Sequence, residues 1–387
     1  MQKIAEPSSE TYLDNCATTR AYPEVAEIVS GVMLDSYGNP SSLHRKGIEA
    51  ESMVKTARAQ ISRVLAVEPE TIVFTSGGTE ANNLALIGAA HALHRSGSHI
   101  ICSAIEHPSV LETIKKLGNE GYQADFCPVD NQGYVKASAL VGLIKENTIL
   151  ISIMAVNNEI GTIQPIAELV RACREKNPQL IIHIDCVQAF GKIKVHPREW
   201  GVNLVTISSH KIHGPKGVGA VYVARGTRLE SLLAGGGQEN KMRAGTENVP
   251  GIAGFGLAAQ MAAENLGDMA NLIKLKLHLI EGLDRLNIKY LLNGPAVLDA
   301  APHIINFSFP GIKGETMVHC LEAEGVYVST GAACSSKKNK VSHVLTAIGR
   351  TEKQAQGSIR VSLSLANSEE DIDRLVGALQ RAIARLA

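Results

Sequence analysis

The sequence predicts an α/β protein in which helices cover a mostly parallel sheet, together with a second, smaller α+β domain. Two observations carry this prediction. Between residues 71 and 223, short runs rich in Ile and Val alternate with helical stretches, and continuous apolar runs are typical of strands buried on both faces. After residue 249 the alternation stops, and longer helical stretches with short strand-like pieces follow. The first pattern favours an α/β sandwich, and the change favours a second domain.

The strands expected in the first domain are six apolar runs. They are Thr71–Ser76, His99–Ser103, Thr148–Val156, Leu180–Asp185, Leu204–Ser208 and Val218–Val223. Helical patterns such as Glu80–Arg95 and Pro165–Lys176 lie between them. This order of strands and helices predicts one sheet with helices packed on it.

The second domain is expected to contain longer helices and a few short strands. Its expected elements are a helical stretch over 252–286 that is interrupted by glycines, strands Ile304–Phe309 and Ile359–Leu363, and helices Thr316–Glu324 and Ser368–Leu386. The last helix begins with Ser368 and Asp371, which have the spacing of a capping box.

Composition and charge exclude several classes of protein. Lys+Arg and Asp+Glu both number 38, so the net charge is zero and the chain lacks the basic footprint of a nucleic-acid-binding protein. The most apolar run, Ile149–Val156, is far shorter than the ~20 residues that a membrane helix needs. The N-terminal residues have no apolar signal core, so we expect a cytoplasmic protein.

The seven cysteines predict a reduced setting. Their number is odd and no Cys-x-x-Cys pair occurs, so neither a disulfide framework nor a zinc knuckle is expected. His210 and His213 have no carboxylate or thiol at metal-ligand spacing, so no resident metal is expected either. A small buried hydrophobic side chain is the expected role of Cys102, Cys127, Cys173 and Cys320.

The first motif that could carry chemistry is Ser76-Gly77-Gly78-Thr79-Glu80, which follows a predicted strand and opens a predicted helix. Its glycines let the backbone approach an anion closely, and a helix N-terminus offers free N–H groups and a favourable dipole. The motif lacks the lysine of a P-loop and is too short for a dinucleotide fingerprint. From these residues alone, a phosphate site and an ordinary strand–helix turn are equally open.

Two further motifs lie at the ends of other predicted strands. Asp185 ends an apolar run, at the edge where open α/β sheets bind ligands. A solvated aspartate at a helix start would give the same pattern. Lys211 follows His210 in a loop rich in Gly and Pro. Such a lysine suits a Schiff-base amine, but a loop lysine in water is the simpler reading.

The three motifs together are more informative than each alone. A phosphate cup, an acid and a lysine all fall at strand ends on one edge of one sheet. An acid can keep a pyridine nitrogen protonated, which makes the ring an electron sink, and a lysine can form the Schiff base. These are the requirements of pyridoxal 5′-phosphate.

The sequence resembles a known family, the group I cysteine desulfurases (NifS/IscS-like) of the class V aminotransferases. The resemblance runs from Tyr12 to the final helix and covers nearly the whole chain. The matching segments are YLDNCATT (12–19), GNPSS (38–42), FTSGGTEANN (74–83), EHPSV (106–110), VNNEIGTIQP (156–165), HIDCVQ (183–188), SSHKIHGPKGVGA (208–220), GGGQE (235–239), RAGTENV (243–249), STGAACSS (329–336) and IRVSLS (359–364). So many ordered matches make chance agreement very improbable.

The resemblance implies the type I fold of pyridoxal-phosphate enzymes, similar to aspartate aminotransferase. A large cofactor-binding domain with a mostly parallel seven-stranded sheet is expected over residues 20–263. Residues 1–19 and 264–387 are expected to form the small domain, which carries the catalytic cysteine loop. The resemblance also implies a homodimer with shared active sites.

The resemblance implies roles for individual residues around the cofactor. Lys211 would hold the cofactor, Asp185 would pair with the pyridine nitrogen, and His107 would stack on the ring and move protons. The phosphate would be held by Gly78, Thr79, Ser208 and His210, and by Thr246 of the neighbouring subunit. The phenolic oxygen would be contacted by Gln188 and Asn158. The substrate carboxylate would be bound by Arg360, supported by Asn39 and Asn158.

Cys334 carries the distinctive chemistry that the resemblance implies. Small residues precede it, and the basic residues Lys337, Lys338 and Lys340 follow. This composition predicts an exposed, mobile loop, and the nearby lysines favour a thiolate. Cys334 would attack the substrate sulfur and carry it as a persulfide. It is also the one candidate metal ligand, as a transient ligand of an iron–sulfur cluster.

The function implied is the conversion of L-cysteine to L-alanine, with sulfur passed to a sulfur acceptor or iron–sulfur scaffold protein or to other thio-cofactors. One alternative is a selenocysteine lyase, which uses the same cofactor machinery. An alternative of another class is a non-catalytic sulfur-delivery subunit that keeps the fold for binding. Intact Lys211, Asp185, His107 and Cys334 argue against the latter.

Overall fold

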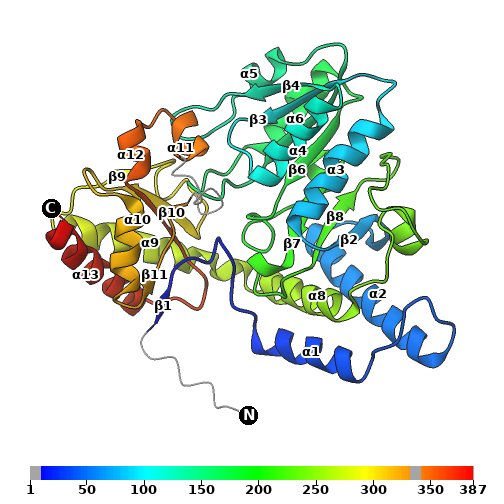
Figure 1. Ribbon diagram of the computed structural model, residues 1–387, viewed down its shortest axis with the longest axis horizontal. Coiled ribbons are helices and arrows are strands. Elements are labelled where there is room, and N and C mark those ends of the chain that lie inside the picture. The colour runs from blue at the N-terminus through cyan, green and yellow to red at the C-terminus, as the bar shows by residue number, and fades with distance from the viewer. Residues whose placement is uncertain (1–9, 332–340, 387) are drawn as a thin grey trace.

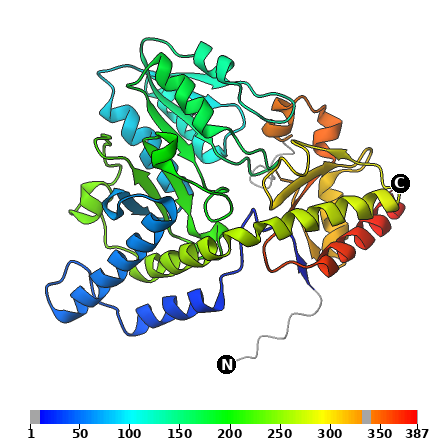
Figure 2. The same cartoon turned by 180° about the vertical axis from the view of Figure 1, so that it is seen from behind.

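The chain forms two lobes, each built around its own sheet (Figure 1). The computed structural model describes residues 10–331 and 341–386. Two consecutive helices, α8 (Val249–Glu264) and α9 (Met269–Arg285), run from the larger lobe into the smaller one (Figure 2). Within the described residues, no helix combines the length and the apolar character needed to cross a membrane.

The larger lobe contains a seven-stranded, mostly parallel sheet, which confirms the predicted fold class. Its strand order is β2-β8-β7-β6-β5-β3-β4, and β8 alone runs antiparallel to its neighbours. The strands are β2 (Ile72–Thr75), β3 (His99–Ser103), β4 (Gln123–Cys127), β5 (Thr148–Met154), β6 (Ile181–Asp185), β7 (Leu204–Ser208) and β8 (Gly219–Val223). All but β4 lie at the apolar runs predicted from the sequence.

Helices cover both faces of this sheet. Alternate residues of a strand point to opposite faces: in β3, Ile100 and Cys102 pack with α3 and α4, whereas Ile101 packs with the cluster that contains α2, α6 and α8. The helices of this lobe, besides α8, are α1 (Pro23–Leu34), α2 (Arg45–Leu65), α3 (Gly78–Ala92), α4 (Pro108–Asn119), α5 (Ala137–Gly142), α6 (Ile166–Lys176) and α7 (Pro197–Trp200). Burial on both faces explains why the strands are continuously apolar.

The smaller lobe surrounds an antiparallel sheet of order β12-β10-β9 and a parallel pair, β1-β11. Its strands are β1 (Thr11–Tyr12), β9 (Leu291–Leu292), β10 (Ile304–Ser308), β11 (Val326–Tyr327) and β12 (Ser358–Ser362), and its helices besides α9 are α10 (Gly314–Glu322), α11 (His343–Ala347), α12 (Glu352–Gln356) and α13 (Glu369–Leu386). Short 3-10 turns complete the chain: η1 (Pro69–Thr71), η2 (Ser209–Lys211), η3 (Gln238–Lys241) and η4 (Leu266–Asp268). Ser368 and Asp371 exchange side-chain to backbone hydrogen bonds of 3.1 and 3.4 Å, which confirms the predicted cap of α13.

The N-terminal segment belongs with the C-terminal part of the chain. Leu13 lies in the same buried apolar cluster as residues of α9, β10 and α13, and β1 pairs with β11. These contacts support the domain boundaries given above, which stay a prediction.

A buried lysine in α9 makes the stability of the smaller lobe dependent on pH. Lys276 is fully buried; its Nζ donates to the carbonyl oxygens of Val297 (3.1 Å) and Ala301 (2.9 Å), and burial lowers its pKa to about 8. The pKa is higher in the unfolded chain, so the unfolded state binds more protons between pH 8 and 10.5. Stability from this residue therefore rises with pH across that window.

Compared with Lys276→Met, the wild type should gain about 2 kcal/mol of unfolding free energy between roughly pH 7 and 9.5. Urea unfolding of both proteins at several pH values measures this difference in unfolding free energy. A difference that stays constant with pH would contradict the prediction.

Candidate active site

Four of the predicted site residues come together at one edge of the large sheet. Asp185 and Ser208 are the last residues of β6 and β7, His107 is the N-cap of α4 after β3, and Asn158 follows β5. The strands β3, β5, β6 and β7 are parallel neighbours, so their carboxyl ends lie side by side. This is the edge where open α/β sheets bind ligands.

The turn into α3 has the features of an anion site. Gly77 precedes the helix with φ 152° and has no side chain to cap it, so the first N–H groups of α3 lack a capping partner. A Cβ on Gly78 would lie 2.9 Å from Cγ2 of Val187 and 3.6 Å from Cβ of Ser208, so the turn packs against the end of β7. The hydroxyl of Ser208 is buried and has no hydrogen-bond partner in the described part of the chain. A buried hydroxyl without a partner beside free helix N–H groups fits a bound phosphate.

Two neighbours of this turn add polar groups. The side chain of Thr79 is exposed at the first turn of α3. Nδ1 of His210 lies 3.2 Å from Oγ1 of Thr18, and burial lowers the pKa of His210 to about 4. A neutral imidazole can contribute a hydrogen bond to the site but no charge.

Asp185 is a buried acid held by two donors. It is 4% exposed, its Oδ1 accepts from the backbone N–H of Val187 (2.9 Å), and its Oδ2 accepts from Nδ2 of Asn82 (2.8 Å). A carboxylate oxygen can accept more than one hydrogen bond, so a protonated ring nitrogen fits beside these donors. Asn82 has no role in the sequence-based prediction.

The amine of Lys211 contacts the N-terminal segment of the chain. Its Nζ donates to the carbonyl oxygens of Cys16 (2.5 Å) and Ala17 (2.7 Å). Nε2 of Gln188 donates to the same Cys16 carbonyl (3.0 Å), so the two predicted residues converge. Burial lowers the pKa of Lys211 to about 8, which makes the neutral, nucleophilic amine accessible near neutral pH.

The ring of His107 caps α4. Its Nδ1 accepts from the backbone N–H of Ser109 (3.1 Å) and lies 2.8 Å from the hydroxyl of the same residue. Burial lowers the pKa of His107, although the charge of Asp185 opposes the shift. The ring is therefore neutral at neutral pH.

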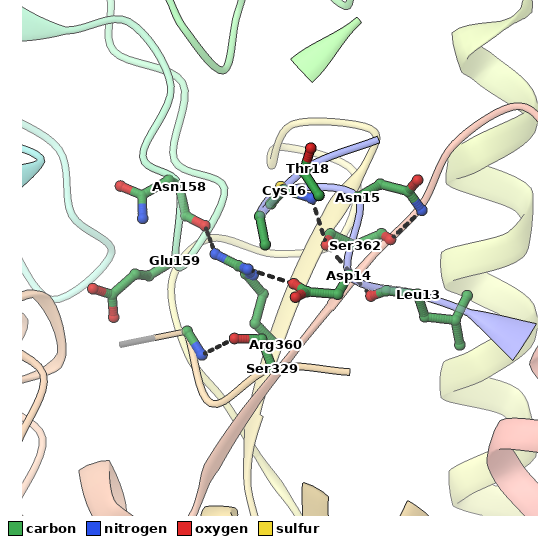
Figure 3. A network of polar contacts seen from close by, with 12 residues as sticks. Leu13, Asp14, Asn15, Cys16, Thr18, Asn158, Glu159, Ser329, Arg360 and Ser362 are labelled. Carbon is green, nitrogen blue, oxygen red and sulfur yellow. Dashed lines mark hydrogen bonds and ion pairs between the residues drawn. The ribbon is translucent and has the colours of Figure 1, made fainter. Parts of the chain in front are cut away.

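Arg360 lies in β12 of the smaller lobe and reaches toward the larger one (Figure 3). Its Nη2 forms an ion pair with Oδ1 of Asp14 (2.6 Å), and its Nη1 donates to the carbonyl of Asn158 (2.9 Å). The residue is 3% exposed, and its Nε is buried without a partner among the described residues. A buried, unpaired guanidinium N–H fits a carboxylate ligand.

Three predicted site residues are not brought to this place within one described chain. Asn39 is part of the loop between α1 and α2, which lies at the end of the larger lobe away from the smaller lobe (Figures 1 and 2), and its Oδ1 accepts from the N–H of Ser41 (2.9 Å). Thr246 is exposed in the loop before α8. Cys334 lies outside the described residues. In the described ranges, 10–331 and 341–386, no group of three or more His, Cys, Asp or Glu could hold a metal.

A family model decides the relationship. Residues 11–375 match the model of the aminotransferase class-V proteins. The chain belongs to the class V aminotransferase family. Enzymes of this family depend on pyridoxal phosphate, and the resemblance read from the sequence motifs is confirmed.

Individual relatives place the chain among the NifS/IscS-like cysteine desulfurases of this family. Cysteine desulfurase IscS of Dictyoglomus turgidum is 43% identical over 378 residues, which are 97% of this chain and 95% of that protein. A solved structure of a NifS-like protein superposes with a TM-score of 0.92 at 39% identity and covers 97% of this chain and 100% of the other. A structure described as SspA in complex with cysteine has a TM-score of 0.80 at 33% identity, covering 91% of this chain and 98% of the other. These structural neighbours agree with the predicted fold type I.

Proposed function

We propose that this class V aminotransferase converts L-cysteine to L-alanine and transfers the sulfur to Cys334 as a persulfide. The relatives named cysteine desulfurase and the neighbour solved with cysteine support the reaction. The observation that carries the substrate class is Arg360, a buried guanidinium with an unpaired Nε, whose charge is close enough to the amine of Lys211 to lower its pKa. These groups suit an amino acid with a free carboxylate.

The strand-end residues would hold the cofactor. The phosphate would lie on the α3 turn, and Asp185 would face the pyridine nitrogen. The further contacts proposed are those of Gly78, Thr79, Ser208 and His210 with the phosphate, Gln188 and Asn158 with the phenolic oxygen, and His107 with the ring face. When bound, pyridoxal 5′-phosphate supplies an electron sink for the charge that develops at the substrate Cα.

The chain's own residues perform the remaining work. Arg360 orients the substrate by its carboxylate, with Asn39 and Asn158 in support, and Lys211 moves the Cα proton with an amine whose pKa, about 8, suits neutral pH. The thiolate of Cys334 attacks the substrate sulfur. The Cβ–S bond breaks, an S–S bond forms, and the substrate carbon takes up a proton, so one cysteine and one thiol give alanine and one persulfide.

One assay separates this function from its alternatives. The protein is incubated with L-cysteine and a thiol reductant, and alanine and sulfide are measured together. Equal amounts of alanine and sulfide support a desulfurase. The absence of both products would support a sulfur-delivery subunit. A much higher kcat/KM with L-selenocysteine would favour the lyase alternative. Delivery of sulfur to an acceptor or iron–sulfur scaffold protein, and the cytoplasmic location, stay predictions.

A homodimer is proposed because the α1–α2 region exposes large apolar side chains. Leu43 is 96% exposed, Leu34 72% and Tyr37 70%, and exposed apolar surface of this kind marks protein interfaces. Thr246 is exposed in its own chain, so in a dimer the Thr246 of one subunit would be free to contact the phosphate bound by the other subunit.

Subunit mixing tests whether the sites are shared. Lys211→Ala and Thr246→Ala homodimers should each be nearly inactive. Mixed dimers should regain one intact site, so an equal mixture should recover about a quarter of the wild-type activity, since half of the dimers are mixed and one of their two sites is intact. Exchange is followed by mass spectrometry, and mixed dimers that stay inactive would contradict shared sites.

A further inference from the structure

A buried chain of hydrogen bonds connects Asp185 with His107. Asn82, on α3, is 1% exposed; its Nδ2 donates to Oδ2 of Asp185 and to Oγ of Ser109, each at 2.8 Å. Oγ of Ser109 lies 2.8 Å from Nδ1 of His107. The amide of Asn82 has two N–H hydrogens, and both are used here. Two side chains without an assigned role thus join the acid to the histidine.

The geometry at Ser109 determines which nitrogen of His107 carries the hydrogen. The backbone N–H of Ser109 donates to Nδ1 at 3.1 Å, and a backbone N–H can act only as a donor. Nδ1 is therefore the unprotonated nitrogen of the neutral ring, and Nε2 carries the hydrogen. The hydroxyl of Ser109 already accepts from Asn82, so its own hydrogen is directed to Nδ1 as a second donor.

We propose that Asn82 and Ser109 are positioning residues that hold His107 as the neutral Nε2–H tautomer, so that this histidine donates a hydrogen bond from Nε2 instead of accepting a proton there. Protonation of Nδ1 would turn one hydrogen toward the Ser109 N–H and break the cap of α4. In the desulfurase reaction, Lys211 then takes the Cα proton, and His107 donates a hydrogen bond from Nε2. The proposal rests on the proposed function only for this last step.

Nitrogen-15 NMR of labelled histidines tests the proposal on the protein without cysteine, and the missing signal in His107→Asn identifies the ring. In the wild type, Nδ1 should be unprotonated and the pKa should lie below the ordinary ~6.5. Ser109→Ala removes one donor to Nδ1, and Asn82→Ala frees the hydroxyl to accept from a protonated ring. Each change should raise the pKa of His107 by about 0.5–1 unit.

Two variants serve as controls. Ser109→Thr keeps the hydroxyl and should keep the wild-type pKa. Asn83 is the next residue of α3, and its Nδ2 donates to the carbonyl of Thr79 (2.9 Å), so Asn83→Ala should leave the His107 signals unchanged. A hydrogen on Nδ1 in the neutral wild-type ring, or an unchanged pKa in both alanine variants, would overturn the proposal. An absence of alanine production by the wild type would refute the proposed function and leave this result untouched.

Discussion

Lys211→Ala should bind the cofactor without a covalent link and lose nearly all turnover of L-cysteine. The Nζ of Lys211 is the amine expected to attach the cofactor and to move the Cα proton. Removal of a general base alone costs about 10²–10⁴ in rate, and loss of covalent attachment adds to it, so a fall of at least ~10³-fold is expected. The contacts of the α3 turn, Ser208 and Asp185 are untouched, so phosphate-dependent binding should remain.

Borohydride reduction separates attachment from binding. In the wild type, reduction should fix the cofactor on a peptide that contains Lys211, as read by mass spectrometry, whereas the alanine variant should release it on denaturation. The matched control is Lys216→Ala, in the same loop but exposed, which should retain the visible band and the turnover. A Lys211→Ala protein with a fixed cofactor and wild-type turnover would contradict the assignment.

The fold was predictable from sequence where burial alone determines a segment. The internal strands β3 and β7 begin and end at the predicted residues because all of their residues are buried and an apolar run marks each strand. Strand β4 was missed because it is an edge strand that pairs only with β3 and stays partly in water, with Phe126 44% exposed. Its Asp125 forms an ion pair with Lys145 (2.7 Å). A half-solvated strand has no continuous apolar run to detect.

The glycines of residues 252–286 show a second limit. The helical stretch breaks only near Gly267, in η4 between α8 and α9. Gly254 and Gly256 lie inside α8, where a Cβ would come within 2.7 Å of Val29 Cγ2 and 2.5 Å of Ala57 Cα, respectively. These glycines allow α1 and α2 to pack closely on α8, and sequence alone does not separate a packing glycine from a breaking one.

Site residues were predictable from the sequence where they lie at the ends of strands. Asp14, Asn82 and Ser109 were missed although all three lie in the matching segments, because their roles depend on side-chain partners brought together by the fold. The sequence signal was present: Asn82 and Ser109 adjoin the glycine turn and His107. One cysteine expectation was also imprecise, since Cys102, Cys127 and Cys173 are buried but Cys320 is only half-buried.

Five of the six described cysteines are poor substitutes for Cys334. Cys16, Cys102, Cys127, Cys173 and Cys186 are all buried. Burial raises the pKa of Cys127 and Cys173 to about 11, and raises that of Cys186 well above its ordinary value. A sulfur acceptor must form a thiolate and meet a partner, so buried thiols of high pKa are unsuited to the role. The burial of these thiols therefore supports Cys334 as the sulfur acceptor, which is the role that the sequence resemblance implies.

Cys334→Ser should separate cofactor binding from sulfur transfer. Serine keeps the size of the side chain but cannot form a persulfide, so alanine and sulfide production should fall by about 10²-fold or more. Lys211, Asp185 and Arg360 are unchanged, so the visible band and its response to L-cysteine should persist. After a brief incubation with L-cysteine, mass spectrometry should find one extra sulfur atom on Cys334 in the wild type and none in the variant.

Cys320→Ser is the matched control and should behave as the wild type. Undiminished alanine production by Cys334→Ser would exclude Cys334 as the acceptor and turn attention to Cys186 and Cys16, which adjoin Asp185 and Lys211.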